Sequence, residues 1–160
     1  MAKTVISSVR DLRYWGVGSH AQSVVTVELK NELSELAKLS HTLTEFGQRH
    51  KLPQAVSFAI KLALEEIVTN AISHGFTDQR EHRISIGLAL EQSVLRAQVE
   101  DDGPAFNPLE IPAPDTKQPL EERAVGGLGI HLVRTLMDEV EYQRQNGRNV
   151  LVLKKRITEP

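Results

Sequence analysis

Two pairs of strand-forming segments, each joined by a short turn, constrain the fold of this chain more than any other feature of its sequence. Residues 82–90 and 93–101 are rich in strand-forming side chains and are separated by a two-residue turn, and the same arrangement recurs over 140–145 and 149–155. The second pair is joined through Asn-Gly, a dipeptide typical of tight hairpin turns. Because hairpin strands run antiparallel, these segments predict a mostly antiparallel sheet.

Helical periodicity in three stretches completes the fold prediction. After a first strand over 24–29, residues 32–49, with Asn31 as capping residue, and residues 53–74 repeat apolar side chains at helical spacing. A third helix is expected from about 127 to 137. Helices grouped between hairpin strands favour an α+β fold, a two-layer α/β sandwich in which helices cover one face of a mostly antiparallel, mixed sheet.

The composition limits the function classes that remain. The length of 160 residues predicts one domain, and 19 Lys and Arg against 21 Asp and Glu argue against dependence on nucleic-acid phosphates. The absence of cysteine excludes a disulfide scaffold, a cysteine-ligated zinc site and a thiol nucleophile. Without a membrane-length apolar run or a secretory signal, we expect a soluble, cytoplasmic domain over residues 21–160, preceded by an N-terminal arm, residues 1–20, of uncertain structure.

Prolines and glycines are unevenly distributed along the chain. Five of the seven prolines lie within the 16 residues from Pro104 to Pro119, and four of the ten glycines flank this stretch. A segment of this composition without periodicity indicates either a disordered linker or a long functional loop. The motifs on either side of it favour the second interpretation.

The helix expected over 53–74 carries a polar pair on its otherwise apolar side. At about 100° per residue, Asn70 lies within the apolar arc, Glu66 lies at its flank, and Glu65 points toward solvent. A buried amide needs partners, so Asn70 either caps a neighbouring loop or, beside Glu66 as a base, holds a hard cation such as Mg²⁺. His74 continues along the same side and is interpreted as a helix-terminal hydrogen-bonding residue.

Two glycine motifs bracket the proline-rich stretch. Asp101-x-Gly103 places a carboxylate beside a tight turn at a strand end, where it could accept from an exocyclic amine or be an ordinary acidic turn. Gly127-x-Gly129 opens the third helix, where free backbone N–H groups favour a phosphate, unless the glycines are only a hinge. The chain contains neither a Walker motif nor a dinucleotide-binding fingerprint.

These motifs occur in the order typical of one nucleotide-binding superfamily. They are Glu66-x-x-x-Asn70, Asp101-x-Gly103 and Gly127-x-Gly129, with a long loop between the last two. This set resembles the Bergerat-fold ATPases, the gyrase and histidine-kinase superfamily. Within it, the phrases EEIVTNAISHGF, VEDDGPAFNP and GGLGIHLV look like the anti-sigma-factor serine/threonine protein kinases of bacteria, over roughly residues 23–155.

The resemblance implies a role for each matching residue. Glu66 is implied as the general base for a serine hydroxyl or water, and Asn70 as a ligand of Mg²⁺ on the ATP phosphates. Asp101 would accept from the adenine amino group, Gly103 would let the base approach the backbone, and residues from about 104 to 126 would form an ATP lid. The other residues implied in nucleotide binding are Phe106, Gly127, Leu128, Gly129 and Ile130.

The function implied by the resemblance is that of an ATP-dependent kinase. It would phosphorylate a STAS-type anti-anti-sigma protein, sequester a sigma factor and form a homodimer. A nucleotide-dependent partner-switching module without appreciable kinase activity is the alternative of a different class. A histidine-kinase fragment is disfavoured because nothing resembles a phospho-accepting histidine helix, and an α+β domain without a nucleotide is the last alternative.

Two positions depart from the family's pattern. Ala105 stands where many relatives have a second glycine, a change that the smallest side chain should tolerate. Gly147-Arg148-Asn149 stands where a Gly-Thr pair is frequent in the wider superfamily. The second departure leaves the floor of the adenine pocket undetermined by the resemblance.

Overall fold

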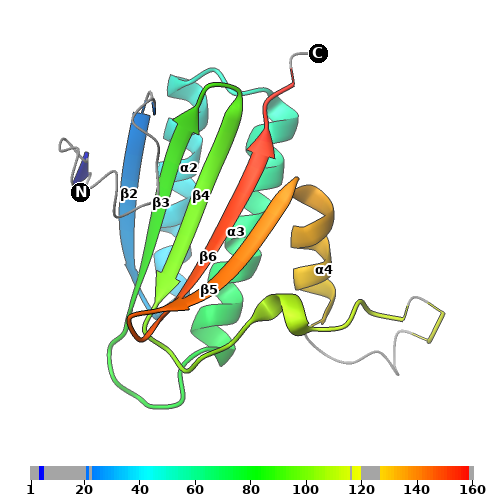
Figure 1. Ribbon diagram of the computed structural model, residues 1–160. Coiled ribbons are helices and arrows are strands. Elements are labelled where there is room, and N and C mark those ends of the chain that lie inside the picture. The colour runs from blue at the N-terminus through cyan, green and yellow to red at the C-terminus, as the bar shows by residue number, and fades with distance from the viewer. Residues whose placement is uncertain (1–3, 6–20, 22, 116, 120–126, 159–160) are drawn as a thin grey trace.

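Helices cover one face of a six-stranded sheet in this protein (Figure 1). The computed structural model describes residues 4–5, 21, 23–115, 117–119 and 127–158. The strands are β1 (Thr4–Val5), β2 (Ser23–Lys30), β3 (Arg83–Glu91), β4 (Val94–Asp101), β5 (Glu139–Gln145) and β6 (Arg148–Arg156). They lie in the order β1-β2-β3-β4-β6-β5.

Every pairing between the described strands is antiparallel. The α+β sandwich is therefore confirmed, while the expected mixed character of the sheet is absent from the described strands. The reason lies in the final hairpin, which inserts β6 beside β4 and leaves β5 at the edge. Asn146 and Gly147 at its turn have φ of 51° and 74°, the left-handed conformation that a tight hairpin turn requires.

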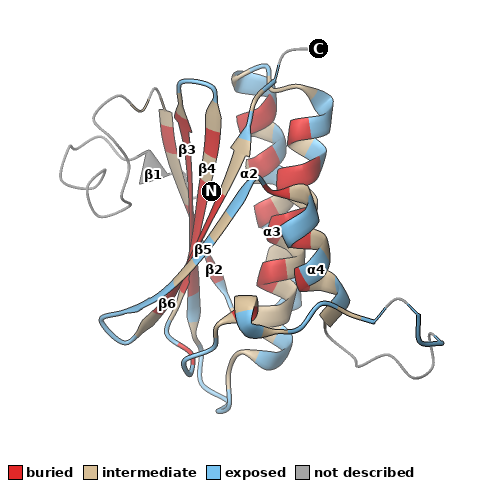
Figure 2. Ribbon diagram, turned by 45° about the vertical axis from the view of Figure 1, so that its right-hand side comes forward, coloured by how far each residue is buried: buried red, intermediate tan, exposed pale blue. Residues whose placement is uncertain are grey.

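The helical layer consists of α2 (Leu36–Arg49), α3 (Gln54–His74) and α4 (Gly127–Leu136). All three pack on the same face of the sheet, and the buried residues gather between the two layers (Figure 2). The apolar side predicted for α3 is buried at Val56, Ala59, Ile60, Ala63, Leu64, Ile67 and Val68. Because a fully buried aliphatic side chain contributes about 1.5–3 kcal/mol, burial of this side fixes how α3 is oriented on the sheet.

Asn31 does not cap the first helix, so that prediction is wrong. A short 3-10 helix, η1 (Leu33–Glu35), precedes α2 and begins without a side-chain cap. Asn31 instead accepts from the backbone N–H of His82 at 3.0 Å and donates to the carbonyl of Arg80 at 3.2 Å. The physical reason is that an amide both donates and accepts, so one side chain satisfies the His82 N–H and the Arg80 carbonyl of the segment that leads into β3. As a helix cap, the side chain would leave these two backbone groups without this partner.

Parts of two sequence predictions lie outside the described residues. Of the arm over residues 1–20, only Thr4–Val5 is described, paired with β2. Of the lid over 104–126, residue 116 and residues 120–126 are outside, while the remainder includes η2 (Pro108–Glu110). Within the described ranges, no helix has the length and apolar character needed to cross a membrane.

Candidate functional site

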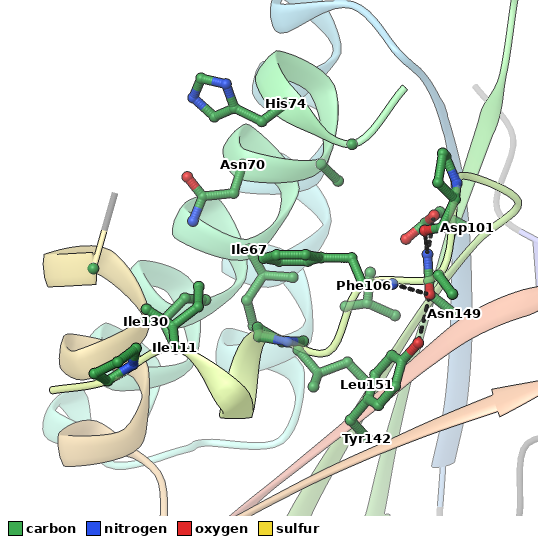
Figure 3. Close-up of a pocket in the computed structure, with 18 of the residues that line it drawn as sticks. Ile67, Asn70, His74, Asp101, Phe106, Ile111, Ile130, Tyr142, Asn149 and Leu151 are labelled. Atoms are coloured by element: carbon green, nitrogen blue, oxygen red, sulfur yellow. Dashed lines mark hydrogen bonds between the residues drawn. The ribbon is translucent and has the colours of Figure 1, made fainter. Parts of the chain in front are cut away.

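A pocket of about 670 Å³ opens between α3, the end of β4, the proline-rich segment and the start of α4 (Figure 3). Of the nine site residues predicted from the sequence, five line this pocket: Asn70, Asp101, Phe106, Gly127 and Ile130. The other four, Glu66, Gly103, Leu128 and Gly129, are not among its lining residues. His74 also lines it, one turn beyond Asn70 on α3 (Figure 3).

Glu66 and Asn70 meet the start of α4 at Gly129. A Cβ atom at Gly129 would lie 2.5 Å from Glu66 Oε2 and 3.6 Å from Asn70 Nδ2. The contact therefore depends on the missing side chain at this position, since real Cβ atoms do not approach so closely. Glycine here lets the first turn of α4, with its free N–H groups, lie directly beside the polar pair of α3.

The side chain of Asn70 is half-buried and makes no hydrogen bond with any residue that the structure describes. Of the two roles left open by its position, capping a described loop is therefore excluded. Glu65 is also half-buried, so it is less exposed than its expected orientation into solvent implies. The reason is that α3 packs between α2 and α4, which leaves it only a narrow solvent-facing arc.

At the opposite end of the pocket, the turn after β4 is held by Asp101. Asp101 Oδ1 accepts from the backbone N–H of Gly103 at 2.9 Å and from Asn149 Nδ2 at 2.9 Å. Oδ2 makes no hydrogen bond within the described part of the chain. Gly103 packs on the end of α3, because a Cβ there would lie 2.5 Å from the Gly75 carbonyl oxygen.

Asn149 is a site residue that the sequence prediction did not include. Its Nδ2 donates to Asp101 Oδ1 and to the carbonyl of Pro104, both at 2.9 Å. Its Oδ1 accepts from the Tyr142 hydroxyl at 2.7 Å and from the backbone N–H of Phe106 at 3.2 Å. Figure 3 shows these contacts on the side of the pocket that Asp101 lines, in the region that the resemblance left undetermined.

A signal for Asn149 exists in the alternation of β6. Leu151 and Leu153, on the same face of the strand, belong to the core, so a polar residue two positions earlier on that face needs partners. Arg144 on β5 adds a further contact that no sequence pattern indicated, because its Nη1 donates to the carbonyl of Gly103 at 2.7 Å. The β5–β6 hairpin thus fixes the turn after β4.

The remaining wall of the pocket is apolar. It includes Ile67 of α3, Val99 of β4 and Leu151 of β6. The Phe106 ring projects into the pocket and is 56% exposed, so a face of the ring is available to a planar ligand (Figure 3). Leu128 is 59% exposed and does not line the pocket, and its predicted role in binding stays a prediction.

The site has few charged groups that could hold a cation. Among the described residues, no group of three or more His, Asp or Glu side chains is arranged to bind a metal ion. The Asn70 amide oxygen is available as a ligand, because the side chain has no hydrogen-bond partner within the described part of the chain. A cation here would take most of its oxygen ligands from a bound phosphate and water, as Mg²⁺ commonly does.

Comparison with known proteins assigns this chain to a family. Residues 29–155 match the family described as the histidine kinase-like ATPase domain. Serine-protein kinase RsbW of Listeria monocytogenes is 27% identical over 139 residues, which cover 84% of this chain and 87% of that protein. Serine/threonine-protein kinase BtrW of Bordetella bronchiseptica is 27% identical over 128 residues, covering 80% and 90%.

A solved structure supports the fold. The crystal structure of the RsbU and RsbW domains of a Mycobacterium tuberculosis protein superposes with a TM-score of 0.63 at 18% identity. The likeness covers 87% of this chain and 33% of that one, so this chain spans about a third of that structure. All three predicted motifs lie within the matched residues 29–155, and the chain belongs to the histidine kinase-like ATPase domain family.

Proposed function

We propose that this protein is an ATP-dependent serine/threonine protein kinase whose active site is the pocket between α3, β4 and α4. The observation that carries the proposal is the distribution of polar groups in and beside this one cavity. Asp101 lies at one end, while Asn70 and Glu66 meet the start of α4 at the other. Family membership and the names of the curated relatives, which are serine or serine/threonine-protein kinases, support the same function.

The Asp101 end suits an adenine base. Asp101 Oδ2 is an acceptor that is free within the described part of the chain, and it can take a hydrogen bond from an exocyclic amine. Ile67, Val99 and Leu151 supply apolar walls for a planar ring, and the exposed face of Phe106 can stack on it. A free acceptor at this position favours an amine over a carbonyl, and hence adenine over guanine.

The α4 end suits phosphates. The first turn of α4 presents backbone N–H groups and the positive end of the helix dipole, and Gly127 lines the pocket there. The Asn70 amide, which has no hydrogen-bond partner among the described residues, fits a Mg²⁺ ion that is otherwise held by phosphate oxygens. When bound, that ion would neutralise charge that develops on the transferring phosphoryl group.

Glu66 is proposed as the general base. Its carboxylate lies against Gly129, beside the turn that would hold the phosphates, and it can accept the proton of an attacking serine or threonine hydroxyl. The hydroxyl oxygen then bonds to the γ-phosphorus as the bond to the ADP oxygen breaks. Little covalent chemistry falls to the protein, so positioning by α3 and α4 supplies most of the catalysis.

The proposed partners follow from the resemblance to anti-sigma kinases. The acceptor of the phosphoryl group is proposed to be a serine of a STAS-type anti-anti-sigma protein, and the sequestered partner a sigma factor. A homodimer in the cytoplasm is proposed on the same ground. The described residues include no membrane-spanning helix that would oppose this placement.

A transfer assay tests the proposal. The purified protein is incubated with ATP labelled at the γ-phosphate, Mg²⁺ and each STAS-domain protein of the source organism, and the labelled residue is identified. We expect label on a serine or threonine of one of them with wild type, and none with Glu66→Gln. Adenine-selective binding without transfer to any of them would instead indicate the partner-switching module, and an absence of ATP binding would contradict both.

A further inference from the structure

Asn149 on β6 joins three other segments of the pocket. Its side chain bonds to Asp101 at the end of β4, to Tyr142 on β5, and to Pro104 and Phe106 at the start of the proline-rich segment. We propose that Asn149 is a positioning residue that sets the direction of the Asp101 carboxylate and fixes the first residues of the lid relative to it. The proposal rests on the adenine role proposed above for Asp101.

The partners of Asn149 determine the orientation of its amide. Both groups facing Nδ2, the Asp101 carboxylate and the Pro104 carbonyl, can only accept a hydrogen bond. The Phe106 N–H can only donate, and the Tyr142 hydroxyl on the same side donates to Oδ1. A reversed amide would oppose acceptor to acceptor and donor to donor, so only one orientation satisfies the network. Asn149 is 9% exposed, which makes an unsatisfied partner costly.

This fixed amide distinguishes the two oxygens of Asp101. Oδ1 is occupied by two donors, Asn149 Nδ2 and the Gly103 N–H, whereas Oδ2 has no partner among the described residues. Rotation of the carboxylate would break the contact with Asn149. Asn149 therefore leaves Oδ2 of Asp101 as the one oxygen of this carboxylate that is available to a ligand. Asn149 positions this acceptor and does not itself accept from the base.

The same amide fixes the start of the lid. Pro104 and Phe106 are bonded to opposite ends of one side chain, with Ala105 between them. The Phe106 ring is thereby carried by a backbone that is held to β6, and the lid begins at a fixed point beside Asp101. Loss of the Asn149 amide would release the Asp101 carboxylate and the Phe106 ring together. An asparagine with only a structural role would not affect these two ligand-facing groups in this way.

The experiment compares the affinities for ATP and for purine riboside 5′-triphosphate, which lacks the 6-amino group. In wild type we expect ATP to bind about 10- to 100-fold more tightly, the range for one hydrogen bond to a charged group. In Asn149→Ala we expect this ratio to fall at least fivefold, because the carboxylate is no longer directed at the amine. A general loss of structure would weaken both ligands equally and leave the ratio unchanged.

Two further variants make the test decisive. Tyr142→Phe removes one donor to Asn149 Oδ1 and keeps the ring, so we expect the ratio of the two triphosphate affinities to fall by less than in Asn149→Ala. If Asn149→Ala does not fold, Tyr142→Phe tests the positioning role in its place. Gln143→Ala removes the neighbouring exposed amide, which bonds only to Gln145 among the described residues, and should leave both affinities unchanged.

The outcomes separate this inference from the proposed function. A wild-type ratio that persists in both Asn149→Ala and Tyr142→Phe would overturn the positioning role while leaving the adenine site intact. A wild type that binds the two triphosphates equally would overturn the adenine role of Asp101 and this inference with it. A wild type that binds neither would overturn the proposed function itself.

Discussion

At the scale of single residues, the proposed chemistry depends on one carboxylate of an adjacent pair. Glu66 lies against Gly129 at the start of α4, whereas Glu65 has no described contact with that helix start. Glu66→Gln should leave the ATP affinity within about twofold and lower the rate of phosphoryl transfer by about 10²–10⁴, the usual contribution of a general base. The two quantities are measured by calorimetry and by single-turnover transfer of labelled phosphate.

Glu65→Gln is the matched control for that prediction, since it makes the same change one residue earlier on the same helix. It should retain the wild-type rate of transfer. If Glu65→Gln abolishes transfer while Glu66→Gln does not, the base has been assigned to the wrong carboxylate.

Gly129 allows a second prediction about the same contact. In Gly129→Ala the new Cβ would lie 2.5 Å from Glu66 Oε2, which is the mobile end of a flexible side chain. The carboxylate can swing away, and alanine favours the helix by about 1 kcal/mol, so the free energy of unfolding should change by less than about 1 kcal/mol. Transfer should nevertheless fall, because Glu66 is displaced from the start of α4.

Chemical denaturation and the transfer assay check this prediction together. A variant that is strongly destabilised, or one that keeps the full rate of transfer, would contradict the account of the contact between α3 and α4.

Asp101→Asn tests the adenine end at the same scale. Asparagine can keep Oδ1 for the donors of Gly103 and Asn149, but it places an NH₂ group where Oδ2 lies, opposite the donating amine of the base. We expect ATP affinity to fall about 10- to 100-fold with little change in the free energy of unfolding. Equal ATP affinity in variant and wild type, measured by calorimetry, would remove the adenine assignment.

At the scale of elements, the loop after α3 is joined to the turn after β4 by one histidine. The His82 ring stacks on Phe76 and bonds to Asp78 at 2.6 Å and to Asp102 at 2.9 Å, next to the proposed adenine acceptor. The hydrogen bonds that the His82 ring donates to Asp78 and Asp102 raise the pKa of His82 above its usual value of 6.5. The two loops that border the pocket are thus held most firmly when His82 is charged.

This shift predicts how stability depends on pH. Because the pKa of His82 is raised on folding, its stabilisation is complete below about pH 6.5 and is lost as the pH rises through the folded-state pKa. The difference in unfolding free energy between wild type and His82→Gln should therefore shrink as the pH rises above about 6.5. Burial lowers the pKa of His50, which makes stability rise with pH. This contribution is the same in wild type and His82→Gln, so it cancels in the difference between them.

Urea denaturation of both proteins at several pH values supplies the measurement. Asp102→Asn should reduce the same pH-dependent difference, because it removes one of the two carboxylates that hold the charged ring. A difference between wild type and His82→Gln that grows with pH would contradict the assignment.

At the scale of the whole molecule, the elements were largely predictable because most of them carry strong local signals. The α3 helix has an uninterrupted apolar side, and the final hairpin has its Asn-Gly turn. What local signals could not supply were contacts between distant segments. Asn31 looked like a helix cap but bonds to the segment before β3, and Asn149 was missed because its partners lie 43 to 48 residues away along the chain, apart from Tyr142.

The candidate site was predictable where its residues belong to motifs that can be read along the sequence. The motifs located five residues that line the pocket, since glycine and carboxylate spacing can be read along the sequence. The solvent exposure of Glu65 was misjudged because helix geometry alone does not say how many neighbours a helix has. Here α3 packs against both α2 and α4, which buries part of the side expected to be free.

The central claim is that the folded chain binds an adenine nucleotide in the pocket between α3, β4 and α4. It is tested most directly by thermal unfolding with ATP, ADP or GTP, each with and without Mg²⁺. A ligand that binds only the folded state stabilises it by about 2.7 kcal/mol at a hundredfold excess over its Kd. We predict a rise in Tm with ATP and ADP that is absent with GTP and is lost in Asp101→Asn; no adenine-selective rise in the wild type would contradict the account.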